Sequence, residues 1–225
     1  MTAPTLKLGP FDFEAVMRAE QRVTDRLNRA AAVFEERGIQ YAVIGAHAVS
    51  AWIRWSGYGE GRGTPNVDLM IRRDDLADAT RALLDVGFSK FGTSSQSFVD
   101  NPEKQDRCMW DGLTLRFASE TVKADNNYPH PDVEQVTRLE DKWVLSLEPL
   151  VFTKLVAWRR IDKVHFEDMA EVRLVDRRWA SRFPDDLAQK LTQFFDETEF
   201  VDWVAIQDDC DRQTREEQMQ KNPSP

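Results

Sequence analysis

The N-terminal part of the chain has the apolar periodicity of an amphipathic helix between residues 13 and 37. Charged side chains occupy the opposite face, and the apolar positions recur at helical spacing: Val16, Val23, Leu27, Ala30, Ala31 and Phe34. Gly38 follows the last of them and suits the left-handed backbone that commonly ends a helix. We therefore predict one long helix that buries a single face.

Apolar strands and helices are then predicted to alternate up to residue 147. Runs of β-branched and aromatic residues predict strands over 39–44, 66–71 and 88–91, a hairpin over 107–117 with its turn at Asp111-Gly112, and two short strands within 133–147. Helices are predicted over 46–55 and from a cap at Asp74 or Asp75 to Gly87. The polar segment 92–106 is predicted to be the most mobile loop of the chain.

The pattern beyond residue 147 is helical throughout. A first helix is predicted from its apolar stripe of Leu150, Val151, Leu155 and Trp158, and Asp162 is expected to cap a second helix that carries Phe166 and Met169. Further helices are expected over about 184–195 and 199–210, followed by a charged tail that we expect to be disordered. The chain is thus predicted to have a core domain at 13–147, a helical region at 148–210 and a tail at 211–225.

The composition narrows the class of protein. With 225 residues and a formal net charge of −9, the chain fits one large domain, or a domain with a small appendage. A long nucleic acid is not expected as a partner because proteins that follow phosphate backbones usually have basic surfaces, although a local basic groove stays open. No apolar run approaches the ~18 residues of a membrane span. Cys108 and Cys210 are isolated, which favours a reduced, cytoplasmic compartment.

A glycine-rich loop followed by a strand carries the strongest candidate chemistry. The loop 56–64 contains four glycines and leads into Asn66-Val67-Asp68. In a strand, Asn66 and Asp68 would project to the same face, while Val67, Leu69 and Ile71 would face the core. Two carboxylates in that arrangement would hold a divalent metal. Here only Asp68 is a carboxylate.

These segments resemble the nucleotidyltransferase superfamily, which has the DNA polymerase β-like fold, and in particular the bacterial minimal nucleotidyltransferases and AbiEii-type toxins. The resemblance covers about residues 35–174. It rests on three stretches: Ile44-Gly45-Ala46-His47-Ala48, Arg62-Gly63-Thr64-Pro65-Asn66-Val67-Asp68-Leu69, and a later helix with Lys154, Ala157, Arg159, Arg160, Asp162 and Asp168. It implies an α+β fold, a small mixed sheet flanked by helices and followed by a helical region.

The resemblance also implies a site for phosphoryl transfer from a nucleoside triphosphate. Gly45 and Ala46 would offer backbone N–H groups to phosphates at a helix N-terminus. Arg62, Thr64 and Lys154 would be further nucleotide-binding residues. Asp68 and Asn66 would be the catalytic pair and would hold Mg²⁺, with a third acid from a neighbouring strand.

The sequence departs from the family pattern at two positions. Asn66 replaces the first aspartate, and its amide oxygen supplies no negative charge to Mg²⁺. The strand after Asp111-Gly112 has no carboxylate on the face of Thr114 and Arg116, where the third acid is expected. Arg116 could instead pair with Asp68 or with a phosphate, and Asp111 or Glu120 could supply the acid.

Two functional hypotheses follow. In the first, the nucleotidyltransferase fold is kept, catalysis is weakened or lost, and the protein binds a nucleotide or a protein partner, for example as half of a toxin–antitoxin pair. In the second, an active Mg²⁺-dependent enzyme moves a nucleoside monophosphate to a small molecule, a protein or an RNA end. Simpler interpretations stay open for single residues: Asn66 and Asp68 as a solvent-facing pair that starts a strand, Arg62 and Thr64 as loop-shaping residues, and Lys154 on the solvated side of an amphipathic helix.

Overall fold

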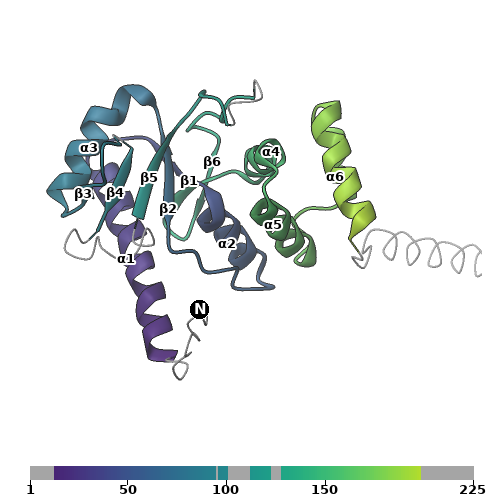
Figure 1. Ribbon diagram of the computed structural model, residues 1–225, viewed down its shortest axis with the longest axis horizontal. Coiled ribbons are helices and arrows are strands. Elements are labelled where there is room, and N and C mark those ends of the chain that lie inside the picture. Colours follow the sequence, from purple (N-terminus) through teal and green to yellow (C-terminus); the bar gives the residue numbers. More distant parts are fainter. Residues whose placement is uncertain (1–12, 95, 101–111, 123–127, 199–225) are drawn as a thin grey trace, which may run out of the picture. The chain divides into compact units, whose positions relative to one another are not determined.

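The computed structural model describes residues 13–94, 96–100, 112–122 and 128–198, with side chains from Met17 onward. The fold is α+β, as predicted (Figure 1). The described residues form two compact units. The first takes its residues from Met1–Ala48, Arg62–Ser119 and Asp132–Leu145, and the second from Val49–Gly61, Glu120–Pro131 and Ser146–Pro225.

The whole sheet belongs to the first unit. Its strands are β1 (Tyr41–Val43), β2 (Val67–Ile71), β3 (Ser89–Lys90), β4 (Ser97–Val99), β5 (Gly112–Phe117), β6 (Val136–Leu139) and β7 (Lys142–Leu145). They lie in the order β3-β4-β5-β2-β1-β7-β6. β2 runs parallel to β5 and β1 runs parallel to β7, whereas the other neighbours are antiparallel, so the sheet is mixed.

Two helices and a short 3-10 turn complete the first unit: α1 (Phe13–Glu36), η1 (Arg73–Asp75) and α3 (Leu76–Asp85). The predicted apolar face of α1 is buried from Leu27 to Phe34, and α1 packs against α3 and β2. Val67 and Leu69 of β2 and Leu113 and Leu115 of β5 are buried and share one apolar core face, as the strand pattern predicted. Burial alternates along β5, whereas Met70 of β2 is fully buried although it projects to the opposite face.

The second unit is helical. Its elements are most of α2 (Gly45–Ser56, which begins in the first unit), α4 (Leu147–Ala157), α5 (Arg160–Glu171), η3 (Arg177–Arg182) and α6 (Asp185–Glu197). The predicted stripe of α4 is buried at Leu150, Val151 and Leu155, and α4 packs against α5 and α6. Trp158 ends α4 in the left-handed region, with φ +47°. Within the described residues, no helix has both the length and the apolar character that a bilayer span requires.

The structure corrects three local predictions. β4 lies within 92–106, which was predicted to be a loop. The predicted hairpin at 107–117 is wrong because β5 has β4 on one side and β2 on the other, so both of its edges are taken. Asp162 is the third residue of α5 and not its cap; its carboxylate still accepts the backbone N–H of Arg159, which is the cap residue. Asp111, the helix expected at 199–210 and the tail at 211–225 lie outside the described residues.

Candidate functional site

Asp68 lies on β2 with its side chain partly open to solvent, at 30% exposure. The residues on either side of it, Val67 and Leu69, are fully buried on the core face of the sheet. Asn66 is exposed and precedes β2 by one residue, so the strand pairing does not hold it in place. Of the two residues expected to bind a metal, only Asp68 is therefore fixed by the sheet.

Gly45 touches the carboxylate of Asp68. The first residue of α2 has φ +68°, and a Cβ atom added to it would lie 3.1 Å from Oδ2 of Asp68. The backbone N–H of Ile44 donates to the carbonyl oxygen of Asp68 over 3.1 Å, which holds the two segments together. Ala46 follows as the second residue of α2. The Gly45-Ala46 turn and Asp68, which the sequence predicted to act together, lie side by side in the first unit.

Arg116 lies on β5, on the face where a third acid was expected. Because β5 runs parallel to β2, Thr114 pairs with Asp68 and Arg116 pairs with Met70. Nε of Arg116 lies 4.0 Å from Oδ1 of Asp68, which confirms the pairing that the sequence suggested for Arg116. The arginine side chain is 51% exposed, so solvent screens the ion pair and its contribution to stability is small.

A buried arginine holds the segment that leads into β2. Arg26 of α1 is 1% exposed, and its Nη1 donates to the carbonyl oxygen of Pro65 over 3.0 Å. Asp100, after β4, lies 3.7 Å from Nε of Arg26 and also pairs with Arg29. The sequence did not single out Arg26, since an arginine on an amphipathic helix is ordinarily solvated. In the same segment Arg62 is exposed and Thr64 is half-buried.

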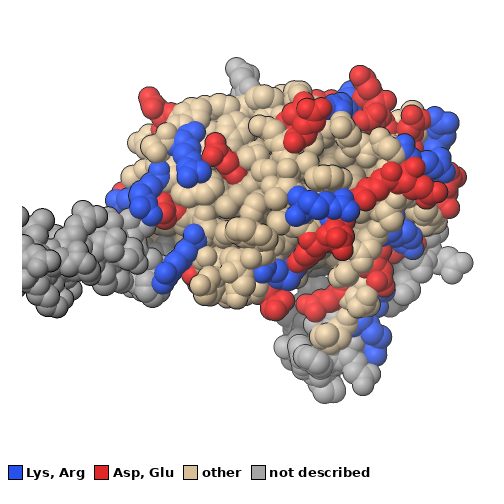
Figure 2. All heavy atoms as spheres, turned by 180° about the vertical axis from the view of Figure 1, so that it is seen from behind, with Lys and Arg blue, Asp and Glu red and all other residues tan. Residues whose placement is uncertain are grey.

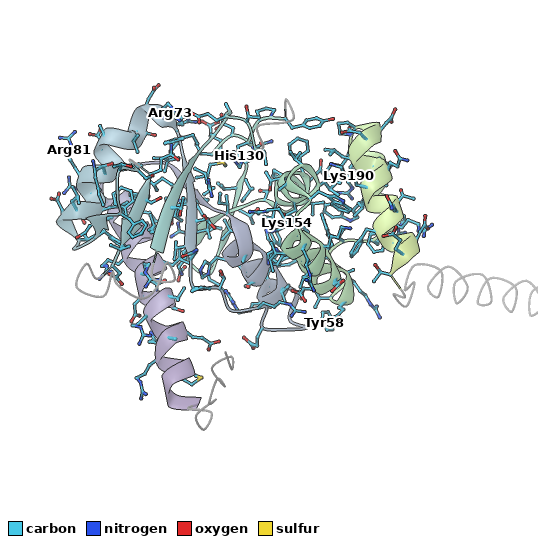
Figure 3. The ribbon with its side chains drawn as sticks, in the orientation of Figure 1. Tyr58, Arg73, Arg81, His130, Lys154 and Lys190 are labelled. Carbon is cyan, nitrogen blue, oxygen red and sulfur yellow. The ribbon has the colours of Figure 1, made fainter. Side chains whose placement is uncertain are left out.

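Lys154 lies in a buried cluster of the second unit (Figure 3). Its Nζ is 2.8 Å from Nδ1 of His165 and 3.4 Å from Oδ1 of Asp162, and the lysine is only 4% exposed. Arg159 also donates to the Asp162 carboxylate, through Nε over 2.9 Å. These contacts join Lys154 to residues of its own unit. The second Arg of the motif, Arg160, is exposed at the start of α5.

The cluster shifts the protonation of its members. Burial, and then the positive charge of Lys154, lower the pKa of His165 to about 4. Burial alone would raise the pKa of Asp162, but the hydrogen bond from Arg159 and the charges of Lys154 and Arg159 outweigh it and lower that pKa. His165 is therefore neutral at pH 7. Since the ammonium group of Lys154 can only donate, Nδ1 accepts and the ring proton is on Nε2.

The described residues do not fit the Mg²⁺ site that the resemblance implies. Such a site needs several oxygen ligands, usually with two or more carboxylates. Asp68 supplies one carboxylate, Asn66 is exposed outside the strand, and the positive charge of Arg116 opposes a cation beside Asp68. Glu120 belongs to the second unit. Across the described ranges, no group of three or more His, Cys, Asp or Glu side chains could hold a metal.

Surface charge in the described part of the chain is mixed. On the face shown in Figure 2, lysine and arginine side chains are interspersed with aspartate and glutamate. Ion pairs between opposite charges occur among the described residues, for example Arg81 with Asp78 and Arg37 with Asp85.

Several solved structures are similar to this chain, including the following three. The antibiotic-resistance factor ANT(2'')-Ia in solution is 11% identical with a TM-score of 0.45, over 85% of this chain and 98% of that one. Crystalline ANT(2'')-Ia in complex with adenylyl-2''-tobramycin is 12% identical with a TM-score of 0.45, over 78% and 97%. JHP933 from Helicobacter pylori is 10% identical with a TM-score of 0.48, over 90% and 98%.

No protein-family model matches the sequence, and a search of the curated proteins finds no match. All three TM-scores are below 0.5, so these similarities carry no argument about function. Function is argued from the residues of the site.

Proposed function

We propose that this chain is a nucleotidyltransferase-fold protein that binds the phosphates of a nucleotide and transfers nucleotides weakly or not at all. The observation that carries the proposal is the 4.0 Å approach of Arg116 to Asp68. A guanidinium group, and not a second carboxylate, stands beside the one acid of the motif.

Arg116 has the properties of a phosphate ligand. Guanidinium presents five N–H donors in a planar fork that matches phosphate oxygens, so Arg116 can bind an anion while it stays beside the Asp68 carboxylate. Half of its side chain is exposed, which leaves the group accessible. Asp68 would orient the guanidinium group, and Gly45, which leaves room for the Asp68 carboxylate, would help to fix the position of that carboxylate.

The same pair argues against efficient transfer. Phosphoryl-transfer sites neutralise the developing charge mainly with metal ions that the protein holds through carboxylates. Here the residues that would hold Mg²⁺ reduce to Asp68 and, more weakly, Asn66, and Arg116 competes for Asp68. Arg116 would thus replace part of the positive charge of the metal, for binding but not for activating an attacking group.

The experiment that tests binding is a calorimetric titration of the protein with ATP in EDTA and again with Mg²⁺. We expect binding in EDTA, and we expect Arg116→Gln to weaken it about 10-fold or more, because a hydrogen bond to a charged group contributes ~1.5–3 kcal/mol and a tenfold change is about 1.4 kcal/mol. Arg81→Gln is the matched control, since Arg81 also pairs with an acid in the first unit but lies on α3. Equal losses in both variants would contradict a ligand role for Arg116.

Catalysis is tested separately with labelled ATP and Mg²⁺. We expect no labelled product from the natural sequence, and tighter Mg²⁺ binding after Asn66→Asp with Arg116→Asp. Transfer of label by the unmodified protein would favour the active Mg²⁺-dependent enzyme instead. If the folded protein binds none of ATP, GTP, CTP and UTP, the protein partner of a cytoplasmic toxin–antitoxin pair becomes the better proposal.

A further inference from the structure

Strand β4 brings a third polar residue into line with Asp68. Ser97 of β4 pairs with Thr114 of β5, and Thr114 pairs with Asp68 of β2. Residues paired directly across neighbouring strands project to the same face of a sheet, with Cβ atoms ~4.5–5.5 Å apart. Ser97, Thr114 and Asp68 therefore form one row across three strands, which we call the polar row.

The polar row lies on the sheet face opposite Val67 and Leu69 and is partly open to solvent, although Met70 on the same face is fully buried. All three of its residues are partly exposed, whereas their strand neighbours Phe98 and Leu113 are buried. Arg116 is two residues further along β5, so it shares this face and lies ~6.7 Å along the strand from Thr114. Among the described residues, neither the Ser97 nor the Thr114 hydroxyl has a hydrogen-bond partner.

We propose that the polyphosphate chain of the bound nucleotide crosses the strands from Arg116 over Thr114 to Ser97, and that both hydroxyls donate hydrogen bonds to phosphate oxygens. The inference rests on the proposed function of the Arg116–Asp68 pair. It assigns Ser97 and Thr114 as binding residues and makes the length of the phosphate chain the property that the site recognises.

Charge determines the direction of the chain across the sheet. The Asp68 carboxylate repels phosphate, and β2 lies on one side of β5. β4 lies on the other side of β5 and presents a neutral hydroxyl donor at Ser97. A polyphosphate anchored by Arg116 therefore extends towards β4, away from Asp68. A single phosphate reaches Arg116 without needing Ser97.

The test is a set of titrations with AMP, ADP and ATP in EDTA for the natural sequence and for single hydroxyl variants. We expect affinity to rise from AMP to ATP. Ser97→Ala should weaken ATP binding about 3- to 10-fold and change AMP binding less than about twofold, since one hydrogen bond contributes ~0.5–1.5 kcal/mol. Thr114→Val should weaken ATP binding by a similar factor, and Thr114→Ser, which retains the hydroxyl, should restore it.

Thr137→Val is the matched control. Thr137 lies on β6, which is three strands away from β2 in the same sheet, so its substitution should leave ATP affinity unchanged. If the natural protein binds ATP but Ser97→Ala and Thr114→Val bind it equally well, this inference is overturned and the proposed function stands. If the folded natural protein binds no ATP at all, the proposed function is overturned and this inference with it.

Discussion

Lys154 shows how the surroundings of a single residue constrain its role. The family resemblance makes it a phosphate ligand, and helix periodicity allows a solvated position. In the structure its ammonium group lies against Asp162 and His165, and Asp162 is fully buried. An ion removed from water needs such partners, and each of them in turn depends on the lysine.

We expect Lys154→Met to lower the free energy of unfolding by about 2–4 kcal/mol. The change leaves Asp162 with Arg159 as its remaining cationic partner and removes the donor to His165. ATP affinity of the folded variant should stay within about twofold of the natural protein. Chemical denaturation measures the free energy of unfolding, and a calorimetric titration of the folded variant measures ATP affinity.

Lys163→Met removes the same charge from α5, where Lys163 lies over the Trp158 ring, and should cost much less stability. A tenfold loss of ATP affinity in Lys154→Met, with stability retained, would instead support the phosphate role that the resemblance implies.

At the level of elements, the junction between β1 and α2 depends on Gly45. The chain must turn from strand to helix within two residues and pass directly beside the Asp68 carboxylate. Glycine satisfies both conditions, because it adopts positive φ without strain and has no Cβ. The junction thereby places a helix N-terminus next to the acid of β2.

We expect Gly45→Ala to destabilise the protein and to weaken ATP binding. The left-handed backbone costs an alanine about 1–2 kcal/mol, and its Cβ, 3.1 Å from Oδ2, must displace the Asp68 carboxylate. Thermal denaturation and ATP titration measure the two effects.

Gly38→Ala separates the effect of backbone strain from the effect on Asp68, because Gly38 has φ +67° but nothing within 4 Å of an added Cβ. It should lose a similar amount of stability to backbone strain and keep full ATP affinity. An equal loss of affinity in both variants would show that Gly45 acts only through stability.

At the level of the whole molecule, the described residues form two compact units. One unit contains the sheet and Asp68, and the other contains the helices and the Lys154 cluster. Chains with more than one unit often unfold in more than one step, so a condition that weakens one unit can leave the other folded.

Acid should weaken the second unit first. The pKa of His165 is about 4 in the folded state against an ordinary value of 6.5, so between these values the unfolded chain binds the extra proton. Stability is therefore full above about pH 6.5 and is lost as the pH falls towards 4, by up to about 3 kcal/mol. The charges that act on the ring are those of Lys154, Asp162, Asp168 and Arg159. Hydrogen exchange at pH 7 and pH 4.5 should show protection falling in α4 and α5 before β2 and β5.

His165→Gln should flatten this pH dependence above pH 4.5, because glutamine can accept from Lys154 but does not titrate. His130→Gln, outside the cluster, should leave the dependence unchanged. The hypothesis fails if the natural protein and His165→Gln lose equal stability between pH 7 and pH 4.5.

Local pattern predicted most of the helices and strands. Buried apolar residues, such as Leu27 and Phe34 of α1 or Val67 and Leu69 of β2, recur with the period of their own helix or strand. That period can be read from nearby positions of the sequence. The α+β class followed from these elements together with the family resemblance. β4 was missed because it lies in a polar segment without the apolar run that marks β1, and it exists through its pairing with β3 and β5.

The candidate site could be predicted from the sequence only in part. Its motifs located Gly45 and Asp68, and comparison with the family pattern showed that Asn66 and Arg116 depart from it. Register across the sheet placed Arg116 beside Asp68 and Ser97 in line with Thr114, and packing buried Arg26 and Lys154. Those outcomes depend on residues from different helices and strands, and strand pairing and burial, not the adjacent sequence, set the distances between them.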